Sequence, residues 1–424
     1  MKQRVVVTGL GICAPNGIGI SEFSEAMFRG RSGIRYMETL RQLGFRCPLG
    51  AAPEVPQDIM ERYFSALERR GLTATGLIYG AMAGQEAWYD AGLDVAPPEE
   101  PDWDTGVLFG TGILGVDTFR EAVMQVDAGN VRRLGSTTVP QTMGSGVSAW
   151  LAGKLGCGNW ASANSSACST GTEAILQASW HIRQGRALRM LVGSCSDSGP
   201  YIWGGFDAMR ILSSLDPADP AAASRPMSAR ASGFVPGSGA GALLLESLES
   251  ARSRGARIYA EILGGAVNNG GQRGGGSMTA ANAEGVRRCI RGSLEDAGVD
   301  SGAIDLINGH LTATTRDPEE IRNWCQALGR SGRDFPLINS SKDVLGHGLA
   351  ASGSMESVGT VLQLSQGVIY GNTNASDLHP EISRQIDPAC VPVKSRNHQV
   401  NIAAKASFGF GDVNSCIIFS RHNT

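Results

Sequence analysis

Short apolar runs that end at glycines alternate with segments of helical spacing along much of the chain. Such runs occupy residues 4–11, 106–112 and 189–194, and they predict buried strands. Residues 75–91 have the spacing of a helix. Because the predicted strands and helices alternate, the pattern indicates an α/β architecture.

One arrangement occurs twice in the sequence. A glycine-rich loop runs into an apolar strand over residues 237–246, and the same design returns over residues 409–419. A further strand is expected to open over residues 257–263, and the glycine-rich residues 264–276 after it are expected to form a loop. Repetition of one design indicates duplication. We therefore expect two related halves, residues 1–254 and residues 255–424.

One cysteine, Cys168, stands among small residues directly before a segment of helical spacing. Serine or threonine at positions 169, 170 and 172 suits a helix start, and apolar residues follow at 174, 175, 178 and 182. A thiol at a helix N-terminus feels the positive end of the helix dipole, which favours the thiolate. The pattern predicts a nucleophile, and a buried structural cysteine is the alternative.

The composition narrows the class of protein. Hydrophobic residues make up 42% of the 424 positions and charged residues only 18%, which is typical of a packed globule with more than one core. A net charge of −3 gives no reason to expect nucleic acid as a partner. The apolar runs are too short to cross a membrane, and the first is too short for a signal peptide. We therefore expect a cytoplasmic protein.

The nine cysteines are scattered and contain no CxxC pair. Neither a zinc site nor a disulfide framework fits that spacing, so no metal and no cofactor are expected. Two of only six histidines, His310 and His347, lie at glycine-flanked exits of short predicted strands, and Lys342 precedes the second of them. Loops at strand exits often carry chemistry. Structural histidines are the alternative for each residue alone, but the set with Cys168 is more specific than its members.

These motifs together resemble those of the elongating β-ketoacyl-acyl-carrier-protein synthases, which are condensing enzymes. Ala-Cys-Ser-Thr-Gly at residues 167–171 is similar to the family's nucleophile motif, and His310 stands where its first histidine stands. Lys342 with His347 matches the Lys…Gly-His motif. Ser-Phe-Gly-Phe-Gly at residues 407–411, with Asn414 following, matches the glycine-rich gate near the C-terminus. The four motifs keep the family's order, and the resemblance covers essentially the whole chain.

The resemblance implies a thiolase-like fold, a duplicated αβαβα five-layer sandwich, and decarboxylative condensation of a Cys168-bound acyl group with malonyl-acyl-carrier protein. His310 and His347 would stabilise the enolate, and Lys342 would keep His310 in order. The backbone N–H groups of Cys168 and Phe408 would form the oxyanion hole, with the Phe408 side chain as a gate. The residues that the resemblance places around this centre are Glu320 and Glu356 as structural support or partners of Lys342, and Ile113, Thr137, Thr138 and Phe206 in the acyl pocket.

The chain departs from the family pattern in three places. Leu311 follows His310 where glycine is usual, and Asp412 stands in the gate in place of glycine. Thr137 and Thr138 occupy positions where many relatives have bulky aromatics, which predicts a wider or longer acyl pocket. These differences indicate a specialised member of the family, in fatty-acid or in polyketide- or polyene-type synthesis.

The expected partners follow from the same resemblance. Acyl carrier proteins are acidic, and two basic doublets, Arg69–Arg70 and Arg132–Arg133, are near the positions that the family uses to dock them; solvated surface charge is the alternative. A homodimer, or a heterodimer with a related subunit, is expected. The alternative functions are a chain-length-determining partner subunit, an acyl-binding module without turnover, and an initiating synthase or thiolase on the same fold.

Overall fold

The computed structural model describes residues 3–215 and 218–422, and its main sheet consists of two halves with the same strand order. The strands of the N-terminal half, from the centre outward, are β1 (Val5–Ala14), β8 (Gly239–Ser247), β7 (Arg189–Ser196), β5 (Thr105–Thr111) and β6 (Ala161–Ser162). Those of the C-terminal half are β9 (Ala260–Asn269), β15 (Val413–Arg421), β14 (Ile402–Gly409), β10 (Leu306–Asn308) and β11 (Leu337–Asn339).

The strand directions also repeat between the two halves. In each half the second strand is antiparallel to both of its neighbours, and the outer strands are parallel to one another. The halves join where β1 and β9 pair antiparallel through Val5–Val7 and Ala260–Ile262. The repeated design in the sequence thus corresponds to a repeated strand topology.

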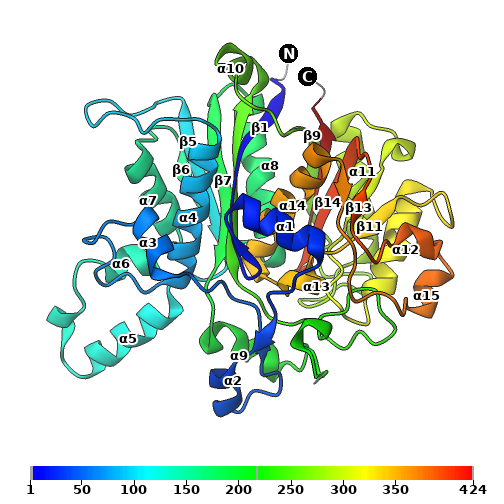
Figure 1. Cartoon of the computed structure of the whole chain (residues 1–424), viewed down its shortest axis with the longest axis horizontal. Helices are drawn as coiled ribbons and strands as arrows, with labels where there is room; N and C mark the ends of the chain where they lie inside the picture. The colour runs from blue at the N-terminus through cyan, green and yellow to red at the C-terminus, as the bar shows by residue number, and fades with distance from the viewer. Residues whose placement is uncertain (1–2, 216–217, 423–424) are drawn as a thin grey trace.

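Helices form three layers around and between the two halves of the sheet (Figure 1). On the outside, α4 (Thr75–Asp90) and α7 (Gly146–Leu155) cover the N-terminal half, and α11 (Ala283–Ala297), with α12 (Asp317–Leu328) packed on it, covers the C-terminal half. Between them lie α8 (Thr170–Arg183) and α14 (Ser352–Gln366). The predicted five-layer αβαβα sandwich is confirmed.

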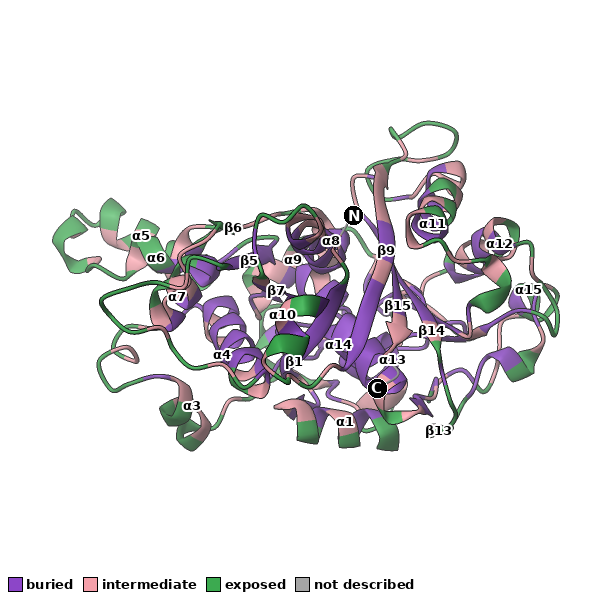
Figure 2. Cartoon of the chain, turned by 90° about the horizontal axis from the view of Figure 1, so that it is seen from above, coloured by how far each residue is buried: buried purple, intermediate pink, exposed green. Residues whose placement is uncertain are grey.

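The middle layer is the most deeply buried part of the molecule, because α8 and α14 have sheet on both sides (Figure 2). The apolar residues at positions 174, 175, 178 and 182 of α8 are fully buried, as their spacing predicted. The two helices begin side by side at Gly171 and Gly353. A Cβ atom on Gly171 would lie 2.4 Å from the backbone nitrogen of Ser354, so only glycine permits this approach. The residues before each helix are thereby brought together.

Several predicted elements are confirmed. The strands expected at residues 4–11, 106–112 and 189–194 are β1, β5 and β7, and the helix expected over 75–91 is α4. The loop expected over residues 264–276 is wrong in its first part, because β9 continues to Asn269. The ladder of β9 with β15 holds Gly264 and Gly265 opposite Ile418 and Ile417, so a partner strand distant in sequence decides this segment. In the described ranges, no helix combines the length and apolarity needed to cross a membrane.

Candidate active site

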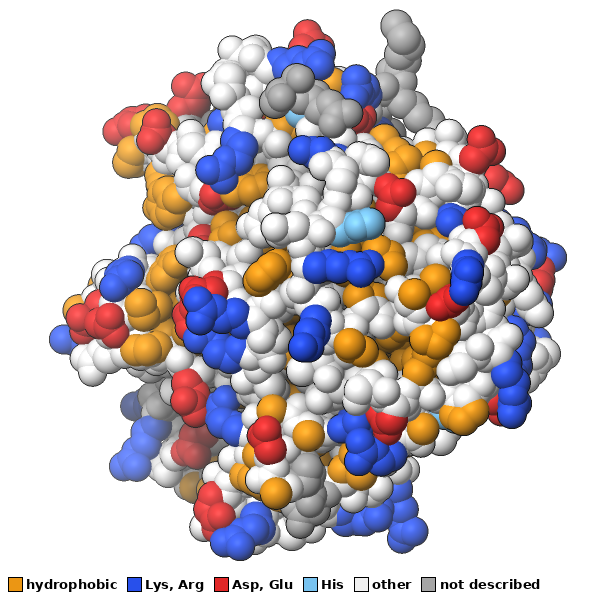
Figure 3. Space-filling model, turned by 45° about the vertical axis from the view of Figure 1, so that its right-hand side comes forward, with side chains coloured by type: hydrophobic (Ala, Val, Ile, Leu, Met, Phe, Trp, Pro, Cys, Tyr) orange, Lys and Arg blue, Asp and Glu red, His pale blue; other side chains and the backbone are white. Residues whose placement is uncertain are grey.

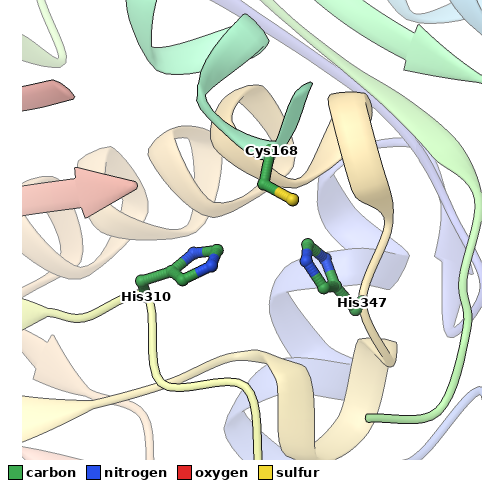
Figure 4. Close-up of side chains that lie close together, drawn as sticks. All are labelled: Cys168, His310 and His347. Atoms are coloured by element: carbon green, nitrogen blue, oxygen red, sulfur yellow. The ribbon is translucent and has the colours of Figure 1, made fainter. Parts of the chain in front are cut away.

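Cys168, His310 and His347 converge on one cavity between the two halves (Figure 4). The sulfur of Cys168 and one ring nitrogen of each histidine all lie within 4.8 Å of one another. Cys168 lies in the turn that leads into α8, His310 follows β10, and His347 lies between the short helix α13 (Lys342–Leu345) and α14. Three segments far apart in the sequence therefore supply one reactive group each.

The Cys168 thiol is held at the start of α8 by a strained turn. Ala167, directly before it, has a φ of 48°, which is uncommon for a residue with a side chain and typical of functional sites. Burial raises the pKa of the Cys168 thiol to about 11, although Lys342 and the backbone N–H of Phe410 act in the opposite direction. The expected thiolate in the free protein is therefore wrong, because desolvation outweighs the charges and dipoles around the sulfur.

The backbone N–H groups that contact the sulfur differ from the pair predicted for the oxyanion hole. The N–H groups that lower the thiol's pKa are those of Cys168 itself and Phe410. Phe408 is instead a buried aromatic whose ring centroid lies 6.2 Å from that of His310. The gate sequence contains two phenylalanines separated by one glycine, and sequence alone does not show which backbone N–H points at the sulfur. The geometry favours the backbone of Phe410 as the second donor.

The proton of neutral His347 is placed by its surroundings. The backbone N–H of Leu349 donates to Nδ1 of His347 at 3.2 Å, and the hydroxyl of Ser352 lies 3.0 Å from the same nitrogen. An imidazole nitrogen that accepts a hydrogen bond carries no proton, so neutral His347 carries its proton on Nε2. The ring of Phe234 packs edge to face against the imidazole, with the two ring centroids 5.0 Å apart. His347 is thus a fixed donor.

The backbone of His310 is held by a buried carboxylate. Glu320 on α12 accepts hydrogen bonds from the backbone N–H groups of His310 and Leu311, both at 2.7 Å. Leu311 has a φ of 25°, in the region that favours the family's usual glycine. Its side chain is fully buried in the C-terminal core, so packing and the Glu320 clamp offset the strain. Nδ1 of His310 is buried and has no hydrogen-bond partner among the described residues, which leaves the tautomer of this ring unfixed.

Two buried lysines share one carboxylate beside the histidines. Nζ of Lys342 donates to Oε1 of Glu356, and Nζ of Lys405 lies 2.9 Å from Oε2 of the same side chain. Of the two partners that the sequence left open for Lys342, it is Glu356 that forms the ion pair. Burial, and then the charge of Lys342, holds the pKa of both histidines well below its usual value. Both rings are therefore neutral at physiological pH.

Sequence reasoning did not identify Lys405. The signal was a lone charged residue in the otherwise apolar or small run of residues 402–407, which forms a strand that is buried from residue 403 onward. Ion-paired charges in such a strand are costly to bury, so their presence points to a purpose. The close Cys/His/His set would also offer three ligands to a metal ion. The two ammonium groups nearby oppose the binding of a cation there.

The gate loop is tied to the loop over residues 270–282. Asp412, at a φ of 64°, accepts hydrogen bonds from the backbone N–H groups of Gln272 at 2.9 Å and Asn282 at 2.7 Å. The N–H of Gly411 donates to the carbonyl of Met278 at 2.8 Å. Aspartate tolerates the left-handed region better than most residues, and its carboxylate supplies contacts that glycine lacks. The unusual residue in the gate therefore fastens one wall of the cavity.

The cavity measures about 330 Å³, and the three reactive residues line it together with aromatic and threonine side chains. Phe206, expected in the acyl pocket, lies behind this wall, with its ring centroid 6.1 Å from that of Phe410 and 5.7 Å from that of Phe234. The other three residues expected in the acyl pocket lie away from this cavity. Ile113 is 61% exposed, and Thr137 and Thr138 line a separate surface hollow, so none of the three lines the cavity in the single chain.

The two basic doublets lie close together. Arg133 and Gly71, the residue after Arg70, line the same surface hollow. Arg69 is occupied by an ion pair with Glu61 at 2.7 Å, whereas Arg70, Arg132 and Arg133 are exposed. On the face in Figure 3, basic and acidic side chains are interspersed. This distribution agrees with the small net charge of the chain.

Comparison with known families gives matches over most of the chain. The family model described as "Beta-ketoacyl synthase, N-terminal domain" matches residues 2–251, and the one described as "Beta-ketoacyl synthase, C-terminal domain" matches residues 259–376. The chloroplastic 3-oxoacyl-[acyl-carrier-protein] synthase I of Arabidopsis thaliana is 35% identical over 423 residues, covering 99% of this chain and 87% of that protein. The 3-oxoacyl-[acyl-carrier-protein] synthase 2 of Vibrio harveyi is 32% identical, with 99% of both chains covered.

Solved structures of ketosynthases are also similar to this chain over its whole length. The chain is similar to an entire ketosynthase chain from a complex with the acyl-carrier protein of a type II polyketide synthase, with a TM-score of 0.87 and 30% identity over 100% of both chains. It is also similar to a chain of the ishigamide ketosynthase/chain length factor, with a TM-score of 0.87 and 25% identity over 100% of both chains.

Proposed function

The chain belongs to the β-ketoacyl synthase family, and we propose that it catalyses the decarboxylative condensation of a Cys168-bound acyl group with malonyl-acyl-carrier protein. The product is a β-ketoacyl-acyl-carrier protein, and the enzyme is an acyltransferase. The observation that carries this proposal is the set of one thiol and two neutral imidazoles at one cavity, with backbone donors at the sulfur.

In the first half-reaction the sulfur of Cys168 attacks the carbonyl carbon of an acyl thioester. Because its pKa is raised, the thiol must lose its proton during the attack, and neutral His310, whose tautomer is unfixed, accepts it. The N–H groups of Cys168 and Phe410 receive the negative oxygen of the tetrahedral intermediate. The carrier thiolate leaves and takes the proton from His310, so that the acyl group remains on Cys168.

In the second half-reaction the malonyl thioester loses CO2, and the electron pair of the broken bond forms an enolate. Nε2–H of His347 and a ring N–H of His310 stabilise the enolate oxygen. A neutral imidazole donates without surrendering its proton, whereas an imidazolium would protonate the enolate and waste it. The enolate carbon then attacks the acyl carbonyl, and Cys168 leaves as a thiolate that takes up one proton from the solvent, the proton that decarboxylative condensation consumes.

We propose an acyl carrier protein and a second ketosynthase-like subunit as partners. The named relatives are acyl-carrier-protein synthases, one solved neighbour is a ketosynthase with its carrier, and another is a ketosynthase/chain length factor. Exposed Arg70, Arg132 and Arg133 suit an acidic carrier. The helix α5 (Val116–Asp127) has no buried residue and exposes Phe119 and Met124, which supports coverage by a second chain (Figure 2).

Two further proposals concern the location of the protein and the boundary between its halves. We propose a cytoplasmic location, which the nine free cysteines support. We also propose a boundary between the halves at residues 254 and 255. The repeated strand topology supports this boundary, because β8 ends the first set of strands and β9 opens the second.

The test is to incubate the protein with acyl carriers of graded length and malonyl carrier, and to identify the products by mass spectrometry. β-Ketoacyl carriers should form, and an acyl group should appear on Cys168. Cys168→Ala should lose acyl transfer, because alanine fits the site without supplying a nucleophile. Full condensation by that variant refutes the assignment, and a stable acyl group on Cys168 that never condenses identifies an acyl-binding module instead.

A further inference from the structure

Lys405 lies at the centre of a buried polar network that reaches both sides of the site. It stands on β14, between β10 and β15, and its side chain is fully buried. Besides Glu356, its ammonium group contacts the carbonyl of Ala406 and donates to the hydroxyl of Ser407 at 3.0 Å. That hydroxyl lies 2.8 Å from the hydroxyl of Thr172 on α8. Lys405 thus connects the ion pair beside the histidines with the helix that follows Cys168.

A second lysine is not needed to neutralise Glu356, because Lys342 already pairs with one of its oxygens. With Lys405 on the other oxygen, Glu356 is divided between two cations. The positive charge of Lys342 is then only partly cancelled where it faces the histidines. The burial of an additional cation is expensive unless it is used.

We propose that Lys405 is a positioning residue of the condensation reaction, which holds Glu356 from the side opposite Lys342 and keeps both histidines in the neutral form. This inference rests on the proposed function and extends it to a residue outside the cavity lining. Lys405 touches no substrate. It acts through Glu356 and through its charge.

The charges around Lys405 are compatible with this role. The titratable groups that face it belong to the elements packed on β14, and they are Glu356, Lys342, Glu320, His310, His347 and Cys416. Lys405 acts together with Lys342 and the stronger effect of burial to lower the pKa of both histidines. Glu320 has the opposite charge, but both of its oxygens are engaged by backbone N–H groups of residues 310 and 311.

The test compares Lys405→Met, which keeps the unbranched shape, with Lys405→Gln, which removes the charge but keeps a donor on a shorter side chain. Lys154→Met is the matched control, because Lys154 is also ion-paired, with Glu68 at 2.8 Å, but lies on α7 away from the cavity. Condensation is measured against pH with a malonyl thioester of a small thiol, so that carrier docking plays no part. Circular dichroism at each pH shows where each variant stays folded, and Lys405→Gln carries the test if Lys405→Met does not fold.

In the wild type, condensation should continue below pH 6.5. In both Lys405 variants the condensation rate should fall off at a higher pH, because the histidines protonate more readily. At that pH a larger share of the malonyl thioester should end as acetyl thioester, which forms when the enolate is protonated before it condenses. At neutral pH the rate should fall by about 10-fold or more, the order found when the partners that orient metal-bound histidines are removed. Acyl loading of Cys168 at neutral pH should stay within a few-fold of wild type. The control should match the wild type throughout.

The double variant Lys405→Met with Glu356→Gln separates charge from packing. It leaves Lys342 as an unpaired cation, so the acid fall-off should move back toward the wild-type pH. An acid fall-off that does not move in the folded single variants, or that stays displaced in the double variant, overturns the inference. Failure of the wild type to condense at all refutes the proposed function instead, so the two failures are distinguishable.

Discussion

Replacing His347 by alanine removes the donor whose proton is best placed in this structure. The imidazole is 3% exposed, is held at Nδ1 by Leu349 and Ser352, and is packed against Phe234, so it requires no reorganisation during the reaction. Loss of one such preorganised donor costs about 2.7–4 kcal/mol, or about 100- to 1,000-fold in rate. We expect a loss of this size in condensation, with acyl loading of Cys168 changed by less than about 10-fold.

The assay follows both half-reactions on one protein sample, acyl-Cys168 by intact mass and β-ketoacyl product by chromatography. The alanine variant leaves the N–H of Leu349 without its acceptor, which costs about 1–3 kcal/mol of stability, so its unfolding transition must be measured first. His379→Ala is the matched control, because His379 also accepts a backbone N–H at Nδ1, from Glu381 at 3.2 Å, but on the surface. Equal losses in loading and condensation, or condensation within a few-fold of wild type, would refute the assigned role.

Further expected outcomes concern pH, stability and product length. His310 and His347 have folded pKa values below their usual value, so the neutral form persists as pH falls through 6.5, and wild-type condensation measured against pH should persist there too. Glu356→Ala leaves two buried cations without their counter-ion and should lower the free energy of unfolding by about 3–5 kcal/mol in denaturant titrations. Asp412→Gly relieves a positive φ but loses two charge-assisted hydrogen bonds. It should lower the free energy of unfolding by about 1–3 kcal/mol and expose residues 270–282 to proteolysis. Thr138→Phe should leave the longest product unchanged if each chain acts alone; a shorter product would show that the segment enters a partner's cavity.

Local sequence determined the elements and the identity of the reagents. Strands such as β1 and β7 are short apolar runs bounded by glycines, and α8 has its apolar residues on the buried face, so each element follows from its own residues. Cys168, His310, Lys342 and the other reactive residues could be recognised because their chemistry depends on residue type, order and neighbours. The repeated loop-and-strand design indicated duplication, and the strand order that the two halves share came from the structure.

Tertiary structure decided what depends on surroundings. The thiol of Cys168 is protonated because burial, which a motif does not record, outweighs the helix terminus in setting its pKa. The choice between Phe408 and Phe410 required the position of the backbone N–H relative to the sulfur. Lys405 was recognised as part of the site only from the ion pair that it forms across from β14 to Glu356 on α14. Thr138 lies in a surface hollow of the single chain and not at the cavity, a placement that the sequence did not predict. Sequence specifies which groups are present, whereas their pKa values, donor directions and access depend on atoms that are distant along the chain.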